Sequence, residues 1–252
     1  MKLKKIQKKS DNSKFLRFEM KYILNQKQSE NIKKEIQNFM IYDKFTNDKK
    51  NYFVRSLYFE NHLFNNFHDK IDGLKLRHKF RIRTYSQEFD KNSTIYLELK
   101  GRQNEMTYKI RTKIKPEILD LFYNKKLNFK IKNKLENNNL IDKFILETHR
   151  KKISPLVLID YLREPYINNS GIYFRLTFDS NLKATQTNNL FASKNNWFHC
   201  IPGYEILEVK FNLTIPAWFQ KIIQSHELRR LSVSKFVLGL EHTKLAKDYE
   251  GK

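Results

Sequence analysis

The segments KFRIR at residues 79–83 and IYLELK at residues 95–100 decide the fold, because each alternates charged and apolar side chains. In a β-strand, residues two positions apart project from the same face. Lys79, Arg81 and Arg83 therefore share one face, and Phe80 and Ile82 share the other. The pattern predicts strands that have one apolar face and one strongly charged face.

The same alternation recurs along much of the chain. The further charged sets are Glu98 with Lys100, Lys109 with Arg111 and Lys113, Arg175 with Thr177 and Asp179, and Glu208 with Lys210. An ordinary half-exposed sheet would also have a polar outer face. The alternative is a closed tunnel whose apolar residues pack outward against helices and whose charged residues line a wet interior. The mixture of Arg and Glu favours the tunnel, and converging guanidinium and ammonium groups would hold a polyanion there.

The overall charge points the same way, but weakly. The chain has 252 residues and a net charge of +22, from 49 basic and 27 acidic residues. Such an excess suggests nucleic acid, a phosphorylated metabolite or an acidic membrane surface as partner. Most of the basic residues are lysines, as an A+T-rich genome would produce. The positions of the arginines are therefore more informative than the bulk charge.

The order of the elements predicts one mixed domain. Residues 1–13 are polar and lysine-rich and are predicted to be a disordered basic arm, and residues 14–248 are predicted to be a single domain. The predicted strands cover residues 15–24, 52–61, 75–85, 93–102, 106–114, 156–166, 172–182 and 204–212. The predicted helices cover residues 26–41, 62–73, 116–150 with a break at 137–139, 216–230 and 234–248. The two halves are expected to contribute strands to one sheet system.

Several other kinds of site are disfavoured. Cys200 is the single cysteine, so the chain can form neither an intramolecular disulfide nor a cysteine-based zinc cluster. No P-loop, dinucleotide fingerprint or paired histidine motif is present. Aromatic residues lie opposite the charges on the strands, whereas stacking on RNA needs both on one face. With no signal peptide and no apolar run long enough to span a membrane, the protein is expected to be cytoplasmic.

Nine segments together resemble the vacuolar transporter chaperone (VTC) domain, the polyphosphate polymerase branch of the triphosphate tunnel metalloenzymes. They are RFEMKY, SLYF, KFRIRTY, YLELKGR, YKIR, LIDYLR, FRLTFD, ILEVKFN and SKFVLG, in the order of the family. The resemblance covers about residues 15–245. It implies an α+β fold, an antiparallel β tunnel or barrel of about eight strands with a charged interior, surrounded by helices. It also implies transfer of the γ-phosphate of ATP to a growing polyphosphate chain with Mn²⁺ or Mg²⁺.

The resemblance also assigns site residues. The implied phosphate ligands are Lys21, Arg81, Arg83, Lys100, Lys109, Arg163, Arg175 and Lys235, with Tyr161, Lys210 and Ser234 at further motif positions. Glu208 is the implied metal ligand, and Glu19 and Glu98 are either helpers of the metal or ion-pair partners of the basic residues. The expected partners are ATP and inorganic polyphosphate, without nucleic acid, and any membrane protein partner would be a separate chain.

One departure from the superfamily's motif, at Arg17, and one from strict strand alternation, at Arg163, leave questions open. Hydrolases of the superfamily usually begin with Glu-x-Glu-x-Lys, whereas this chain has Arg17, Glu19 and Lys21, which favours a polymerase over a triphosphatase. A hydrolase of the same fold, or a non-catalytic module that binds polyphosphate or nucleic acid, stays an alternative. Arg163 shares its strand face with Val157, Ile159 and Tyr161, so a bulge or a strand end is expected near it.

Overall fold

Strands form where apolar and polar side chains alternate, as predicted. The computed structural model describes residues 16–46, 48, 50–123, 139–168, 171–192 and 196–247. The strands among them are β1 (Arg17–Asn25), β2 (Met40–Tyr42), β3 (Tyr52–Glu60), β4 (Leu76–Thr84), β5 (Ile95–Gln103), β6 (Met106–Ile114), β7 (Ser154–Asn168), β8 (Phe174–Gln186), β9 (Phe198–His199) and β10 (Tyr204–Phe211). The helices are α1 (Gln26–Ile36), α2 (Asn65–Ile71), the 3-10 turn η1 (Pro116–Ile118), α3 (Leu119–Tyr123), α4 (Asn139–Lys151), α5 (Ala217–Ser225) and α6 (Lys235–His242).

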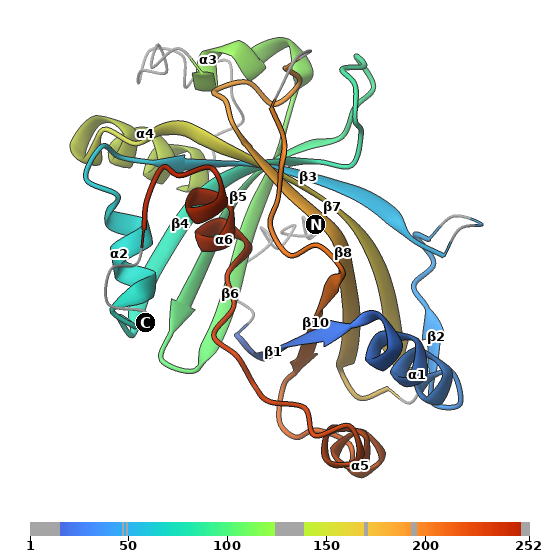
Figure 1. Cartoon of the computed structure of the whole chain (residues 1–252). Helices are drawn as coiled ribbons and strands as arrows, with labels where there is room; N and C mark the ends of the chain where they lie inside the picture. The colour runs from blue at the N-terminus through green and yellow to red at the C-terminus, as the bar shows by residue number, and fades with distance from the viewer. Residues whose placement is uncertain are drawn as a thin grey trace, which may run out of the picture.

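The sheet closes on itself. Its strand order is β2-β7-β3-β4-β5-β6-β1-β10-β8-β9, and β7 also pairs with β8. The eight strands from β7 to β8 therefore form a ring, with β2 and β9 attached outside it. All neighbours are antiparallel, and both halves of the chain contribute strands to the ring (Figure 1). Strands β3, β4, β5, β6 and β1 of the first half lie side by side, and β10, β8 and β7 of the second half complete the ring. The prediction of an α+β tunnel of about eight strands is confirmed.

The ring is weakest between β1 and β6, where two residue pairs, Arg17 with Thr107 and Phe18 with Met106, join the strands. We call this short pairing the β1–β6 seam. Residues 228–234, the crossing segment, run beside it from α5 to α6 (Figure 1). The Leu231 amide donates to the Lys21 carbonyl at 2.9 Å, and Lys21 Nζ donates to the Val233 carbonyl at 3.1 Å. The crossing segment thus continues the tunnel wall along the free part of β1.

Apolar side chains on the outer face of the ring bury against helices. Phe80, Ile82, Leu97 and Leu99 pack with Phe144 of α4 in one cluster. A second cluster joins the outer faces of β1, β8 and β10 to α1 and α5. Burial of apolar surface in these two layers stabilises the closed ring around its charged interior.

Helix α6 packs inside one end of the ring. Its Phe236, Val237 and Leu240 share a buried cluster with Val157 and Ile159 of β7. The approach is close: a Cβ added at Gly239 would lie 2.8 Å from Ile159 Cδ1. Part of the inner wall is therefore apolar, because α6 and not water lies against it.

Several element boundaries differ from the prediction. The first helix ends at Ile36 instead of residue 41, and Met40–Tyr42 instead form β2 against β7. The last two helices end at Ser225 and His242, short of residues 230 and 248. Each is followed by a non-glycine residue in the left-handed region, Glu227 at φ 49° and Lys244 at φ 58°. Without glycine, the sequence carried no stop signal there.

Two predictions fall outside the described residues. They are the disordered arm at residues 1–13 and nearly all of the helix break at residues 137–139. In the part of the chain that the structure describes, none of the helices combines the length and apolar character needed to span a membrane.

Candidate active site

The ring encloses a cavity of about 1000 Å³ lined by the charged faces of the strands. Every predicted site residue except Glu98 lines it: Glu19, Lys21, Arg81, Arg83, Lys100, Lys109, Tyr161, Arg163, Arg175, Glu208, Lys210, Ser234 and Lys235. Glu98 is fully buried in the wall beneath two of these arginines. The sequence pattern therefore identified the inner face correctly.

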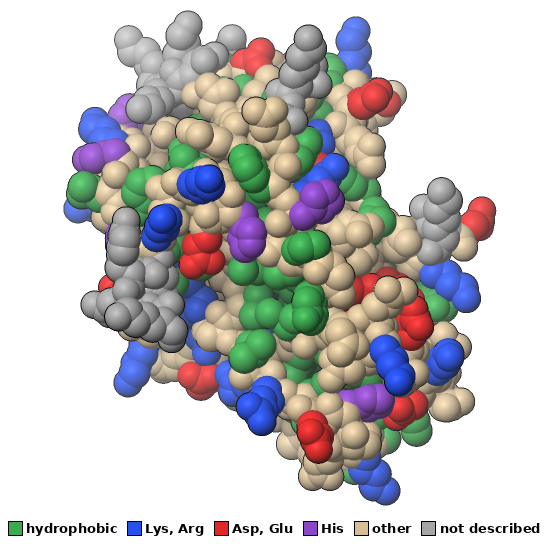
Figure 2. Space-filling model, in the orientation of Figure 1, with side chains coloured by type: hydrophobic (Ala, Val, Ile, Leu, Met, Phe, Trp, Pro, Cys, Tyr) green, Lys and Arg blue, Asp and Glu red, His purple; other side chains and the backbone are tan. Residues whose placement is uncertain are grey.

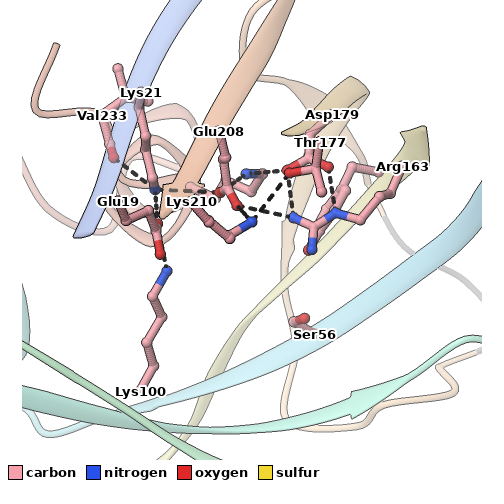
Figure 3. A network of polar contacts seen from close by, with 12 residues as sticks. Glu19, Lys21, Ser56, Lys100, Arg163, Thr177, Asp179, Glu208, Lys210 and Val233 are labelled. Carbon is pink, nitrogen blue, oxygen red and sulfur yellow. Dashed lines mark hydrogen bonds and ion pairs between the residues drawn. The ribbon is translucent and has the colours of Figure 1, made fainter. Parts of the chain in front are cut away.

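Glu208 on β10 lies at the centre of a cluster of cations (Figure 3). Its Oε2 is 2.6 Å from Lys210 Nζ and 3.3 Å from Arg163, and its Oε1 is 2.8 Å from Lys235 Nζ and 3.5 Å from Lys21 Nζ. Burial acts to raise the pKa of Glu208, but Lys210, Lys235 and Lys21 outweigh it and hold the pKa well below its usual range. Glu208 is therefore ionised and gathers four cations around one point.

Asp179 on β8 is the second carboxylate of this cluster, and sequence reasoning did not select it as a site residue. Arg163 Nε and Nη2 donate to its two oxygens, both at 2.7 Å, and Lys235 Nζ lies 2.6 Å from Oδ2. Burial favours the neutral acid, yet Arg163 and Lys235 keep the pKa of Asp179 lowered. The signal that could have identified it was its alternation with Arg175 and Thr177.

Glu19 on β1 connects this strand to β5, which lies two positions away in the ring. Lys100 reaches across from β5 and donates to Glu19 Oε1 at 3.0 Å, and Lys21 Nζ lies 3.4 Å from the same oxygen (Figure 3). Burial acts to raise the pKa of Glu19, but the positive charges of Lys100, Lys21 and Lys210 together outweigh it and lower the pKa. Because Lys21 contacts both Glu19 and Glu208, these two carboxylates belong to one network.

Glu98 anchors a separate cluster on β4 and β5. Its Oε2 accepts from Arg81 Nε at 2.8 Å and lies 3.7 Å from Arg83 Nε, and its Oε1 is 3.4 Å from Lys109 Nζ. The hydroxyl of Tyr161 accepts from Arg83 at 3.1 Å. These contacts fix both guanidinium groups, which is the preorganisation that charge stabilisation requires.

Some cations in the tunnel have little compensation. Burial and the neighbouring cations Lys100 and Lys21 lower the pKa of Lys79 to about 7, and the described residues place no carboxylate in ion-pair contact with it. Lys79 Nζ lies instead 4.7 Å from the centre of the Phe236 ring. Burial also lowers the pKa of Lys109 and of Lys210 to about 7, although carboxylates oppose the change. A bound polyanion would relieve this mutual repulsion.

Arg163 lies on the inner face by simple alternation. Against β3 the inner residues of β7 are in unbroken register, and the register shift between Asp160 and Leu162 occurs on the β8 side. The bulge that the sequence predicted is therefore present, but it is not the main reason for the pattern. Val157 and Ile159 are apolar because α6 covers them, whereas Tyr161 and Arg163 face the cavity.

The three predicted metal-ligating carboxylates are divided between two clusters. Glu19 and Glu208 share Lys21, whereas Glu98 belongs to the Arg81 cluster. Among the described residues no group of three His, Cys, Asp or Glu side chains is placed to hold a metal ion. Mg²⁺, however, is commonly held by one or two carboxylates together with substrate phosphates and water. Glu19 and Glu208 both line the cavity and share Lys21, so these two carboxylates fit a metal ion that arrives with phosphate.

The outer face drawn in Figure 2 does not repeat this concentration of charge. Figure 2 shows Lys and Arg side chains scattered over one face among apolar and other polar groups, not gathered into a single patch. The cavity, in contrast, is lined by sixteen Lys and Arg residues and three Glu residues. Basic side chains are thus concentrated in the interior.

Comparison with solved structures supports the tunnel fold. A putative adenylyl cyclase from Hippeastrum, described as having a dominant triphosphatase activity, matches with a TM-score of 0.52 and 13% identity over 90% of this chain and 95% of its own. A protein from Pyrococcus horikoshii OT3 matches with a TM-score of 0.46 and 14% identity, over 89% of this chain and 98% of its own. A putative adenylate cyclase from Bacillus halodurans matches with a TM-score of 0.47 and 13% identity, over 86% and 93%.

Sequence comparison identifies the family directly. No match was found among curated proteins. The family model for the VTC domain, however, matches residues 16–244, which include every strand of the ring and every residue of the clusters described above. The chain belongs to the VTC domain family.

Proposed function

We propose that the tunnel is the active site of a polyphosphate polymerase, which transfers the γ-phosphoryl group of ATP to the end of a polyphosphate chain. The observation that carries the proposal is the charge of the interior, where sixteen basic residues line the cavity with three carboxylates. A polymer of phosphates needs cations over its whole length, whereas a single small anion would need only a few of them. Family membership supports the same reaction.

The residues divide the work of phosphoryl transfer between them. Arg81 and Arg83, fixed by Glu98 and Tyr161, are placed to hold the equatorial oxygens of the transferred group. Lys21, Lys210 and Lys235 would neutralise the phosphates on either side. The bond between the β- and γ-phosphates breaks, ADP leaves, and a terminal oxygen of the chain forms the new phosphoanhydride bond. Catalysis of this kind depends on position and charge more than on covalent chemistry.

Glu208 would hold the divalent ion, with phosphate oxygens and water completing its coordination. A bound Mn²⁺ or Mg²⁺ supplies further neutralisation of charge on the phosphates. Glu19 shares Lys21 with Glu208 and so keeps that ammonium group in position. We expect the metal ion to bind to Glu208 only when the nucleotide is also bound, because the phosphates supply the rest of its ligands.

Arg17 favours synthesis over hydrolysis. It lines the cavity at the position where the related hydrolases have their first glutamate, and its Nε is buried without a hydrogen-bond partner in the described part of the chain. With Arg17 in place of a glutamate, this position loses a ligand for a metal ion that would activate water. It gains a cation that can hold phosphate. The competing function is a triphosphatase, which the similar Hippeastrum structure favours because that protein is described as one.

The test is to incubate the protein with ATP, Mn²⁺ and a short polyphosphate primer, measuring ADP, orthophosphate and polymer length in the same samples. We expect ADP to appear in step with longer polymer, and both products to disappear when the metal is chelated. Release of orthophosphate without lengthening would assign the protein to the hydrolases. Tight polyphosphate binding without turnover would leave a phosphate-binding module.

A further inference from the structure

The two ends of the tunnel carry different kinds of side chain, as the inward residues of β4 and β5 show. The inward residues of β4 run from Arg77 through Lys79, Arg81 and Arg83, and Tyr85 follows just beyond the strand. On β5 they run from Arg102 to Tyr96. At about 3.3 Å per residue, Arg77 and Tyr85 are roughly 26 Å apart. One end of the tunnel is therefore cationic and the other aromatic.

The cationic end opens into a second cavity of about 370 Å³. Lys70, Lys75, Arg77 and Arg102 line it, and it contains no aromatic side chain. Glu105 is its one carboxylate and is paired with Arg102 and Arg230. Burial, with help from Arg77, lowers the pKa of Lys70 to about 8. The lining of this second cavity suits phosphates and includes no aromatic side chain on which a ring could stack.

The aromatic end carries five rings, those of Phe45, Tyr52, Tyr85, Tyr96 and Tyr173. Tyr52 and Tyr85 meet edge to face with their centres 5.6 Å apart. Tyr85 is 38% exposed and Phe45 is 74% exposed, so ring faces remain available at the opening. Arg111 lies over Tyr96 at 4.6 Å, which places a cation among the rings.

The rings adjoin the phosphate ligands. Tyr52 is directly opposite Arg163 in the pairing of β3 with β7, and Tyr96 is directly opposite Arg83 in the pairing of β4 with β5. Burial raises the pKa of Tyr52, and the positive charges of Arg163 and Arg175 oppose that rise, so both guanidinium groups act on the ring. A flat group stacked here would direct an attached chain of phosphates toward Arg83, Arg163 and Arg175.

We infer that the aromatic end binds the nucleoside of the triphosphate donor, with the base against Tyr85 and Tyr52, and that the polymer occupies the cationic end. The inference rests on the proposed function, since it concerns the orientation of the donor in the same tunnel. Stacking of a base on an aromatic side chain commonly strengthens binding by tenfold or more. The aromatic end therefore distinguishes a nucleoside triphosphate from inorganic tripolyphosphate, which carries no base.

The experiment measures the affinities of ATP and of tripolyphosphate, each with Mn²⁺, for the full chain by calorimetry, and the fluorescence of etheno-ATP on binding. In Tyr85→Ala and in Tyr52→Leu we expect ATP to bind about tenfold more weakly, tripolyphosphate to change less than twofold, and quenching of the etheno base to be lost. Tyr204→Ala is the control, because Tyr204 is 50% exposed and lies outside the cavity lining. It is expected to alter neither affinity.

Each result has one meaning. Equal affinities of wild type and both tyrosine variants for ATP, with tripolyphosphate still bound, would overturn the assignment of the nucleoside and leave the proposed function standing. Parallel losses for both ligands would also overturn it, because the tyrosines would then act on phosphate alone. Failure of the wild-type protein to bind either ligand would remove the proposed function and the inference together.

Discussion

Arg163 and Asp179 form a bidentate ion pair across β7 and β8, with both N–O distances at 2.7 Å. Asp179 is fully buried, and Lys235 of α6 also contacts it at 2.6 Å. This one carboxylate thus holds an arginine of the wall and a lysine of the inserted helix. It sets the position of two groups that line the cavity.

We expect Asp179→Asn to destabilise the protein by about 3–5 kcal/mol, because it leaves Arg163 and Lys235 buried with less compensation. Urea denaturation measures the change. Arg163→Met combined with Asp179→Asn should cost less than the sum of the two single changes, because the double variant removes both members of the pair. Simple additivity would show that the pair contributes no coupling.

Arg81→Ala should lower the rate of polymer synthesis by about 10² or more, by analogy with loss of a preorganised donor at a charged transition state. The measurement is ADP release with ATP and primer at saturating concentrations. Arg150→Ala supplies the matched control, since Arg150 is an exposed arginine at the end of α4 and should be replaceable without loss. Full turnover in Arg81→Ala would contradict the role given to the β4 arginines.

Glu208→Gln tests the metal and the cation cluster together. The amide is weaker as a metal ligand, and it no longer compensates Lys21, Lys210, Lys235 and Arg163. We expect loss of metal-dependent turnover, a lower melting temperature, and a larger rise in melting temperature on adding polyphosphate than in the wild type. An unchanged requirement for Mn²⁺ in the variant would place the metal elsewhere.

Lys79 predicts a specific pH dependence. Its pKa is about 7 in the folded protein but about 10.4 in an unfolded chain, so the unfolded chain binds more protons between those values. Its contribution therefore makes the ligand-free protein more stable as the pH rises from 7 toward 10. Bound phosphates favour the ammonium form instead, so polyphosphate binding should take up protons at pH 8 and weaken toward pH 9.

Calorimetry of polyphosphate binding at pH 8, in two buffers with different ionisation enthalpies, measures this proton uptake. Lys79→Gln should reduce it, with Lys109 contributing to the remainder because its pKa is also about 7. Binding that takes up no protons in the wild type would mean that these lysines are already charged in the free tunnel.

Gly101→Ala is expected to destabilise the sheet without altering the charges of the tunnel. The added Cβ would lie 2.1 Å from Cζ of Tyr108, which is paired with Gly101 across β5 and β6. Overpacking of this kind costs about 1–3 kcal/mol. The double variant Gly101→Ala, Tyr108→Leu should recover part of the loss in thermal denaturation, and no recovery would indicate a backbone effect.

Strands were predictable from the sequence because their alternation is local. Phe80 and Ile82 pack outward and Arg81 and Arg83 face inward, and this is visible in five consecutive letters. The ends of α5 and α6 were not predictable, since the residues that leave the helix in the left-handed region are Glu227 and Lys244 and not glycine. The short strand β2 was predicted as helix because the buried Met40 fits the spacing of a helix face as well as that of a strand face.

The site was predictable as far as its charges follow the strands. Asp179 was visible only as part of an alternating set, because its partners Arg163 and Lys235 come from distant segments. The aromatic end could not be found, since Tyr52, Tyr85 and Tyr96 come from separate segments and meet only when β3, β4 and β5 pair in their observed register. Likewise the apolar residues on the inner face of β7 make sense only once α6 is seen to cover them.

The closing strand β1 has a consequence for how the protein reaches its native state. Although β1 comes first among the described strands, its long pairing is with β10, and Lys21 also bonds to Val233, 212 residues later. The tunnel therefore cannot close until nearly the whole polypeptide is available, a topology of high contact order that slows folding. Until the ring closes, water solvates the inner charges. The free energy needed to remove this water is therefore spent when β1 joins the sheet. Polyanions present at that moment would act as a template for folding, so refolding should be faster when polyphosphate is in the buffer.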